Sequence, residues 1–413
     1  MSDYRNRILK LVGSSIFAQL ISVLSSPILT RIYSPEDFGI FSLFLSFVGI
    51  LGPISAFNFE LVIQRQLTEE NAFGVFELGI YTAFCNSILF SMLFYFMVRF
   101  DLLGFGVFHW GHTLMVLFTL IAIATFGLSR FMLIRLNDFE TINKVTIIRS
   151  LIRSVLQCVL GILIPSSFGL LLGETVGRGA GNWQMIKKFQ TRRRLAHISD
   201  SLKSRFLVNK NYPFFVAPST LINAAATLMP VVLINKYYTI ELAGLYGLVI
   251  RAVDLPVAVI GASVADAYYE RASNERARLK EFIWKHVLWL FFIALIGAIG
   301  LFFSAGTIFS LVFGQEWGDA GQILVLLLPH FVLQFCIFPI SRTLHLIGQE
   351  KFKLIYDLSA FISATLPFVL GSQFKLSFQD TVFTYSCFRG LSYLLMFVLI
   401  LNLVKRYENS FGK

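Results

Sequence analysis

Residues 31–43 read RIYSPEDFGIFSL, and residues 236–248 read KYYTIELAGLYGL. The two stretches lie 205 residues apart and share one pattern: a basic residue, then tyrosine, serine or threonine, glutamate, glycine, an aromatic residue and leucine. A weaker similarity between the two halves is the dipeptide Ser-Arg, which occurs at 129–130 and again at 341–342. An internal repeat of this kind predicts that the chain consists of two related halves.

Both copies of the repeat lie between long apolar runs. Hydrophobic residues make up 56% of the 413 residues, charged residues only 14%, and the mean hydropathy is +0.71. Soluble globular proteins carry about 25% charged residues, which excludes a cytosolic enzyme, a disordered scaffold and a coiled coil. Runs of about 20 apolar residues predict transmembrane helices. We identify twelve such runs, at 8–30, 38–63, 73–98, 106–134, 142–164, 167–187, 213–235, 240–268, 282–305, 320–347, 351–371 and 380–404.

The longest polar stretch, 187–212, separates six predicted helices from six. We therefore expect an all-α polytopic membrane protein with two six-helix bundles, 1–200 (including most of this basic linker) and 201–413. Because six is an even number, both halves enter the membrane in the same orientation, which predicts a parallel repeat suited to rocking around a central cavity. The linker either sets the topology or binds anionic lipid headgroups.

The distribution of basic residues predicts the orientation in the membrane. The chain has 35 Lys and Arg against 24 Asp and Glu, a formal net charge of +11. With a cytoplasmic N-terminus and alternating helices, 24 of the basic residues fall on the cytoplasmic side and four on the other. Positively charged loops stay cytoplasmic, so both termini are expected there. The positive charge therefore indicates membrane topology, not a nucleic-acid partner.

Sequence motifs for catalysis and metal binding are missing. There is no GxxxxGK[ST], HExxH or GxSxG motif, and the four cysteines lie far apart within apolar runs. We therefore expect no enzyme activity, no catalytic residues, no metal site and no cofactor other than a coupling H⁺ or Na⁺.

Arginines inside the predicted helices are the candidate site residues, because a charge in hydrocarbon is costly unless it faces a cavity or a partner. Those nearest the middle of the bilayer are Arg153, Arg178, Arg251 and Arg389, with Arg149 one turn before Arg153. Glu174 and Asp254 lie at helical spacing from Arg178 and Arg251. These pairs either line a binding site or only form neutralising ion pairs that stabilise their own helices. Arg153 and Arg389 have no carboxylate at that spacing, and we expect them to bind an anionic ligand such as a phosphate.

Two further features have alternative interpretations. Gly169, Gly173, Gly177 and Gly181 form a ladder at four-residue spacing, which favours close helix packing over a flexible gate. Asp266 and Glu60 lie near the cytoplasmic ends of predicted helices. Either one of them binds a coupling ion, or their side chains only reach the membrane–water interface.

Residues 14–63, with the turn from Tyr33 to Gly39, resemble the opening of Wzx-type polysaccharide flippases, as do 248–273 and 311–321. This family belongs to the MOP exporter superfamily, together with the MATE drug exporters and the lipid II flippase. The resemblance implies a flippase of the bacterial inner membrane, with a cationic lumen, ion coupling and alternating access. Its implied substrate is an undecaprenyl-diphosphate-linked oligosaccharide of lipopolysaccharide O-antigen or another polysaccharide, moved from the cytoplasmic to the periplasmic leaflet. Membrane lipid, a polysaccharide polymerase and chain-length proteins are the other partners it implies.

Two alternative functions remain open. A MATE-like multidrug exporter would have the same architecture, but it would need carboxylates for cationic drugs. A membrane polysaccharide polymerase or glycosyltransferase would need a long outer loop, and the predicted outer loops are short.

Overall fold

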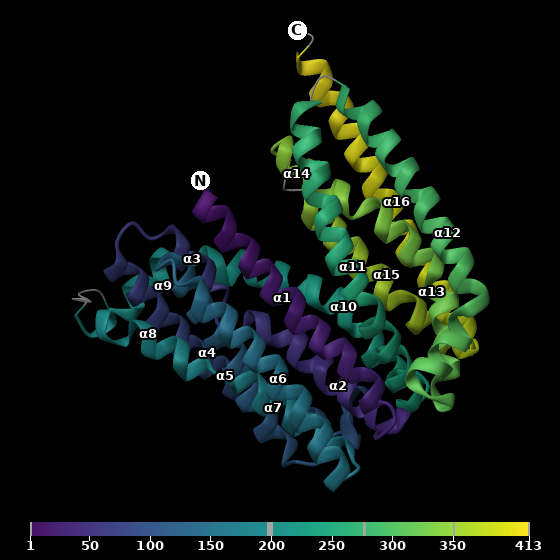
Figure 1. Ribbon diagram of the computed structural model, residues 1–413, viewed down its shortest axis with the longest axis horizontal. Coiled ribbons are helices and arrows are strands. Elements are labelled where there is room, and N and C mark those ends of the chain that lie inside the picture. Colours follow the sequence, from purple (N-terminus) through teal and green to yellow (C-terminus); the bar gives the residue numbers. More distant parts are fainter. Residues whose placement is uncertain (1, 196–200, 276–277, 350–351, 412–413) are drawn as a thin grey trace. The chain divides into compact units, whose positions relative to one another are not determined.

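The computed structural model describes residues 2–195, 201–275, 278–349 and 352–411, and every regular element within them is helical (Figure 1). The chain divides into two compact units, Met1–Ala224 and Ala225–Lys413. This division falls inside helix α10 (Ala217–Tyr237), further along the chain than the lobe boundary predicted at 200/201.

Helices of the first unit precede α10 along the chain. They are α1 (Ser2–Leu29), α2 (Pro35–Leu51), α3 (Phe59–Arg65), α4 (Glu69–Arg99), α5 (His112–Arg135), α6 (Phe139–Leu163), α7 (Ser167–Gly179), α8 (Asn182–Leu195) and α9 (Leu202–Val208). The second unit contains α11 (Ile240–Asn274), α12 (Leu279–Phe313), α13 (Gly318–Ile337), α14 (Thr343–Leu346), α15 (Phe352–Gln373) and α16 (Phe378–Phe411).

Each copy of the sequence repeat begins a helix. Ser34 caps α2, because its hydroxyl accepts a hydrogen bond from the Asp37 amide at 3.2 Å while the Asp37 carboxylate accepts one from the Ser34 amide at 3.1 Å. Thr239 caps α11 through the first of these two hydrogen bonds only, accepting from the Leu242 amide at 3.2 Å. Such caps satisfy backbone N–H groups that have no partner within the helix. The serine or threonine of the repeat therefore fixes where the second helix of each half starts.

The repeat tyrosines attach these turns to an equivalent helix pair. The Tyr33 hydroxyl donates to the Gln157 carbonyl on α6 at 2.7 Å, and burial raises the pKa of this hydroxyl, which keeps it protonated as a donor. In the second unit the Tyr238 hydroxyl shares a 2.5 Å hydrogen bond with Thr381 on α16. Helix α6 packs against α7 in the first unit, and α15 packs against α16 in the second. In the same way α4 packs against α5, and α12 packs against α13. The two units thus use the same order of packed helices.

Nine helical segments within the described residues are long and apolar enough to cross a membrane, and one of them, Pro35–Arg65, combines α2 and α3. They are Pro35–Arg65, Glu69–Arg99, His112–Arg135, Phe139–Leu163, Tyr212–Tyr237, Leu279–Phe313, Gln315–Arg342, Ile355–Gln373 and Phe378–Asn409. Each corresponds to one predicted run. The runs at 8–30 and 240–268 lie in α1 and α11, and the run at 167–187 is divided between α7 and α8; the crossing of the membrane by these three runs stays a prediction.

The apolar surface of α12 shows how these helices meet lipid. Only 6% of the most apolar 18-residue stretch of this helix is buried. Phe303 and Leu311 are 81% and 77% exposed. Contiguous apolar surface of this extent is rare on soluble monomers, so this helix faces hydrocarbon.

The predicted continuous helix at 167–187 is interrupted. Helix α7 ends at Gly179, and Gly181 adopts a left-handed conformation with φ +78° before α8 begins at Asn182. At 1.5 Å per residue, the 13 residues of α7 span about 20 Å, short of the roughly 30 Å of a bilayer core.

Candidate functional site

Two glycines bring α6 and α7 into backbone contact. A Cβ atom on Gly177 would lie 2.5 Å from the Cβ and 2.8 Å from the Cα of Arg153, and one on Gly173 would lie 2.6 Å from the Gln157 Cγ. Only glycine allows this approach. The close packing predicted for the glycine ladder is confirmed at these two positions, and it sets the distance between the charged residues of α6 and α7.

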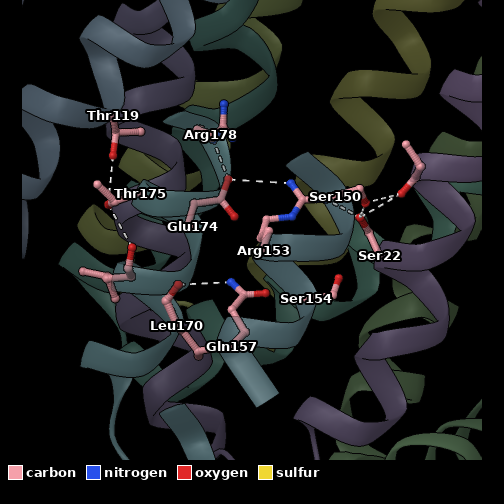
Figure 2. Close-up of polar contacts among 12 residues, drawn as sticks. Ser22, Thr119, Ser150, Arg153, Ser154, Gln157, Leu170, Glu174, Thr175 and Arg178 are labelled. Atoms are coloured by element: carbon pink, nitrogen blue, oxygen red, sulfur yellow. Dashed lines mark hydrogen bonds and ion pairs between the residues drawn. The ribbon is translucent and has the colours of Figure 1, made fainter. Parts of the chain in front are cut away.

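Glu174 lies between two arginines at this helix contact. Its Oε1 atom is 2.5 Å from the Nε of Arg178, one turn later on α7, and 3.8 Å from the Nη1 of Arg153 on α6 (Figure 2). The glutamate side chain is 2% exposed, whereas each arginine side chain is 28% exposed. Arg153 has no carboxylate at helical spacing on α6, but α7 supplies one, because helical spacing detects only partners on the same helix.

Hydroxyl groups surround the other side of Arg153. Its Nη2 donates to the Ser22 hydroxyl of α1, which shares a 3.2 Å hydrogen bond with Ser150. Ser25 and Ser154 pair across the same helix contact at 3.2 Å. Sequence analysis missed these serines, although Ser150, Arg153, Ser154 and Gln157 follow the i, i+3, i+4, i+7 spacing of one helix face.

Arg149 completes the charged cluster of the first unit. Its guanidinium lies 3.7 Å from the centroid of the Phe126 ring of α5, and its electrostatic neighbours are Arg178, Arg153 and Glu174. These four residues form what we call the arginine cluster. Three guanidinium groups and one carboxylate give it a formal surplus of two positive charges, and partly exposed guanidinium groups are suited to binding phosphate or carboxylate oxygens.

Arg389 of the second unit has a different environment. It is only 8% exposed; its Nη1 donates to the Ala360 carbonyl at 3.1 Å, and its guanidinium lies 5.4 Å from the centroid of the Tyr393 ring. His330 stacks on Tyr393 at 5.7 Å, and Tyr385 lies 6.1 Å from His330. In the described part of the chain, the contacts of Arg389 are thus a carbonyl and aromatic rings, not a carboxylate. No sequence signal connected these distant aromatic residues.

The other predicted site residues are Arg251, Asp254, Asp266 and Glu60. Arg251 lies on α11 and is partly buried, while the side chains of Asp254 and Asp266 fall outside the described residues. Glu60 lies in the first turn of α3 and is partly buried. Substrate binding by Arg251 and ion coupling at Asp266 and Glu60 stay predictions. Among the described side chains, no group of three or more His, Cys, Asp or Glu residues could hold a metal ion.

Solved structures of membrane transporters have the same fold. The lipid II flippase MurJ in an inward closed conformation superposes with a TM-score of 0.74 at 16% identity, covering 96% of this chain and 90% of its own. A multidrug resistance MATE transporter of the MOP superfamily, inward-facing, gives 0.67 at 13% identity, covering 95% and 96%. A MOP superfamily transporter from Pyrococcus furiosus gives 0.54 at 11% identity, covering 97% and 96%. This chain therefore shares the fold of the MurJ and MATE transporters, as predicted.

Among curated protein sequences none matches this chain significantly. The family described as polysaccharide biosynthesis protein matches residues 28–322, which include the first copy of the repeat, the arginine cluster and the second copy. That match covers well over half of the 413 residues. The resemblance seen in the sequence is thus confirmed, and the chain is a multi-pass membrane protein that belongs to the polysaccharide biosynthesis protein family.

Proposed function

We propose that this protein is a flippase for an undecaprenyl-diphosphate-linked oligosaccharide, the repeat unit of O-antigen or another polysaccharide. It moves this lipid from the cytoplasmic to the periplasmic leaflet of a bacterial inner membrane by alternating access, coupled to H⁺ or Na⁺. Both termini lie in the cytoplasm, and a polymerase with its chain-length proteins receives the product. Membership of the polysaccharide biosynthesis family and the fold shared with a lipid II flippase support a lipid-linked substrate.

The arginine cluster is the observation that carries this proposal. Its formal surplus of two positive charges matches a diphosphate diester, which has two negative charges near neutral pH. Arg153 and Arg178 are each 28% exposed, so their guanidinium groups remain accessible while held in place by Glu174 and Ser22. Guanidinium groups bind phosphate oxygens through paired hydrogen bonds. A drug exporter for organic cations is less well supported, because this cluster would repel a cationic ligand.

Replacing Arg153 with alanine tests the proposal. In a strain whose own copy of the gene is deleted, we expect Arg153→Ala to lower surface polysaccharide at least about tenfold, as expected when one partner of a charged contact is removed. Lysine should restore export only in part, because it keeps the charge but loses the paired hydrogen bonds. The measurement is surface polysaccharide by immunoblot, normalised to the amount of inserted protein.

Arg99→Ala is the matched control, since Arg99 is an exposed arginine at the end of α4. It removes the same charge at a distance from the cluster and should export normally. Wild-type export by Arg153→Ala would overturn the role of the cluster. If the deletion strain keeps its polysaccharide but loses resistance to cationic drugs, the exporter alternative is correct instead.

A further inference from the structure

Arg205 on α9 is a buried cation. It is only 7% exposed, and its Nη1 nitrogen is buried without a hydrogen-bond partner. The part of the chain that the structure describes offers this guanidinium no other hydrogen bond and no ion pair. Burying a charge is costly unless the charge is paired and hydrogen-bonded. An anion bound to Arg205 would therefore stabilise the first unit.

Close packing holds this side chain in position. A Cβ atom on Gly74 of α4 would collide with the Nη1 and Cζ atoms of Arg205, so only glycine permits this contact. The next residue, Phe206, packs its ring edge-on against Phe59 of α3, with 6.2 Å between the ring centroids. Helix α9 is thus fixed against α4 and α3, and the place of the guanidinium is set without an acidic partner.

Two acidic residues of α4 are bound to α8 instead. Glu69 lies 3.7 Å from Arg192, and Glu77 lies 3.0 Å from Arg193. These two arginines belong to the basic stretch that the sequence offered as a contact for lipid headgroups. Because they already hold carboxylates of this chain, Arg205 is the better candidate for an anion from outside it.

The surroundings of Arg205 place it at the membrane surface. The apolar segment Tyr212–Tyr237, which is long enough to cross a membrane, begins seven residues further along the chain. Between the two, Leu207 and Val208 are 55% and 78% exposed. Apolar side chains beside basic ones at such a surface contact acyl chains, while the basic groups attract anionic headgroups.

We propose that Arg205 binds the phosphate group of an anionic phospholipid. Guanidinium groups bind phosphate oxygens through paired, charge-assisted hydrogen bonds. The exposed apolar side chains that follow Arg205 favour a lipid over a free phosphate ion, because acyl chains would cover them. This site lies outside the arginine cluster and does not depend on the transported substrate. The bound lipid neutralises the buried cation and stabilises the packing of α9 on α4.

Thermal unfolding of the full-length protein in detergent tests this site. One sample contains added phosphatidylglycerol, one contains phosphatidylcholine and one contains inorganic phosphate. We expect phosphatidylglycerol to raise the wild-type midpoint by about 2–4 °C relative to phosphatidylcholine, because a ligand that binds the folded state stabilises it. Inorganic phosphate should leave the midpoint unchanged.

Arg205→Gln removes the charge and keeps a polar side chain. In phosphatidylcholine its midpoint should equal or exceed that of the wild type, because a buried charge without a partner has been removed. Phosphatidylglycerol should then produce no rise. Lys203→Gln is the matched control, since it removes an exposed basic residue from the same helix and should keep the full rise.

An equal rise for the wild type and Arg205→Gln would overturn the site. Equal losses of the rise in Arg205→Gln and Lys203→Gln would also overturn it, because they would indicate diffuse attraction to surface charge. A rise with inorganic phosphate as large as that with phosphatidylglycerol would contradict a lipid ligand. Should Arg205→Gln not fold, native mass spectrometry of the wild type decides. Retention of phosphatidylglycerol in preference to phosphatidylcholine supports the site, and equal retention overturns it.

Discussion

Individual arginines in this protein have distinct roles set by their surroundings. Arg153 and Arg178 share one glutamate and keep donors at the surface, whereas Arg389 is 8% exposed and bound to a carbonyl and a tyrosine ring. A buried cation without a carboxylate is held in place by the hydrogen bonds and rings that replace water. Arg389 therefore contributes to the packing of α15 and α16, in addition to any contact it makes with substrate.

Replacement of Arg389 with alanine is expected to lower stability. The change removes the donor to the Ala360 carbonyl at 3.1 Å and the guanidinium over Tyr393, and it leaves a cavity between packed helices. Losses of this kind cost about 3 kcal/mol. Thermal unfolding in detergent should show a clearly lower midpoint for Arg389→Ala than for Arg153→Ala, whose site is partly exposed. Equal midpoints would show that Arg389 has no packing role.

At the scale of the elements, α6 and α7 act as one unit because glycine lets their backbones touch. A Cβ atom on Gly177 would collide with Arg153, whereas one on Gly179 would meet nothing within 4 Å. The same helix pair carries the tyrosine contact of the repeat, since a Cβ atom on Gly161 or Gly169 would lie 2.6 or 2.5 Å from the Tyr33 hydroxyl. The position of the arginine cluster therefore depends on small residues that have no charge.

Gly177→Ala should separate α6 from α7 and disturb the arginine cluster. Overpacking of this kind costs about 1–3 kcal/mol, so we expect a lower midpoint of thermal unfolding and reduced polysaccharide export. Gly179→Ala is the matched control on the same helix and should leave both quantities unchanged. A Gly177→Ala protein as stable and as active as the control would show that the two backbones are not in contact.

At the scale of the whole molecule, the asymmetry of basic residues predicts the topology. The linker after α7 and both termini are expected in the cytoplasm, and the turn between α12 and α13 is expected in the periplasm. Thr191 on α8 and Glu316 before α13 are both exposed, so each can carry a reporter cysteine.

In a variant without the four native cysteines, Glu316→Cys should react with a membrane-impermeant maleimide in intact cells. Thr191→Cys should react only after the cells are permeabilised. Labelling with the opposite pattern would reverse the assigned orientation and with it the direction of the proposed transport.

The sequence by itself determined the helical class, nine of the membrane helices, the internal repeat and the family. These features depend on local properties, since hydropathy, helical periodicity and N-cap hydrogen bonds involve residues close together in the chain. Only the tertiary structure decided that Glu174 is shared by Arg178 and Arg153, that α7 stops at Gly179, and that Arg389 lies among tyrosines. Each of these depends on which helices pack together and how closely. That is set by glycine contacts and side chains far apart in sequence, which helical spacing within one helix does not encode.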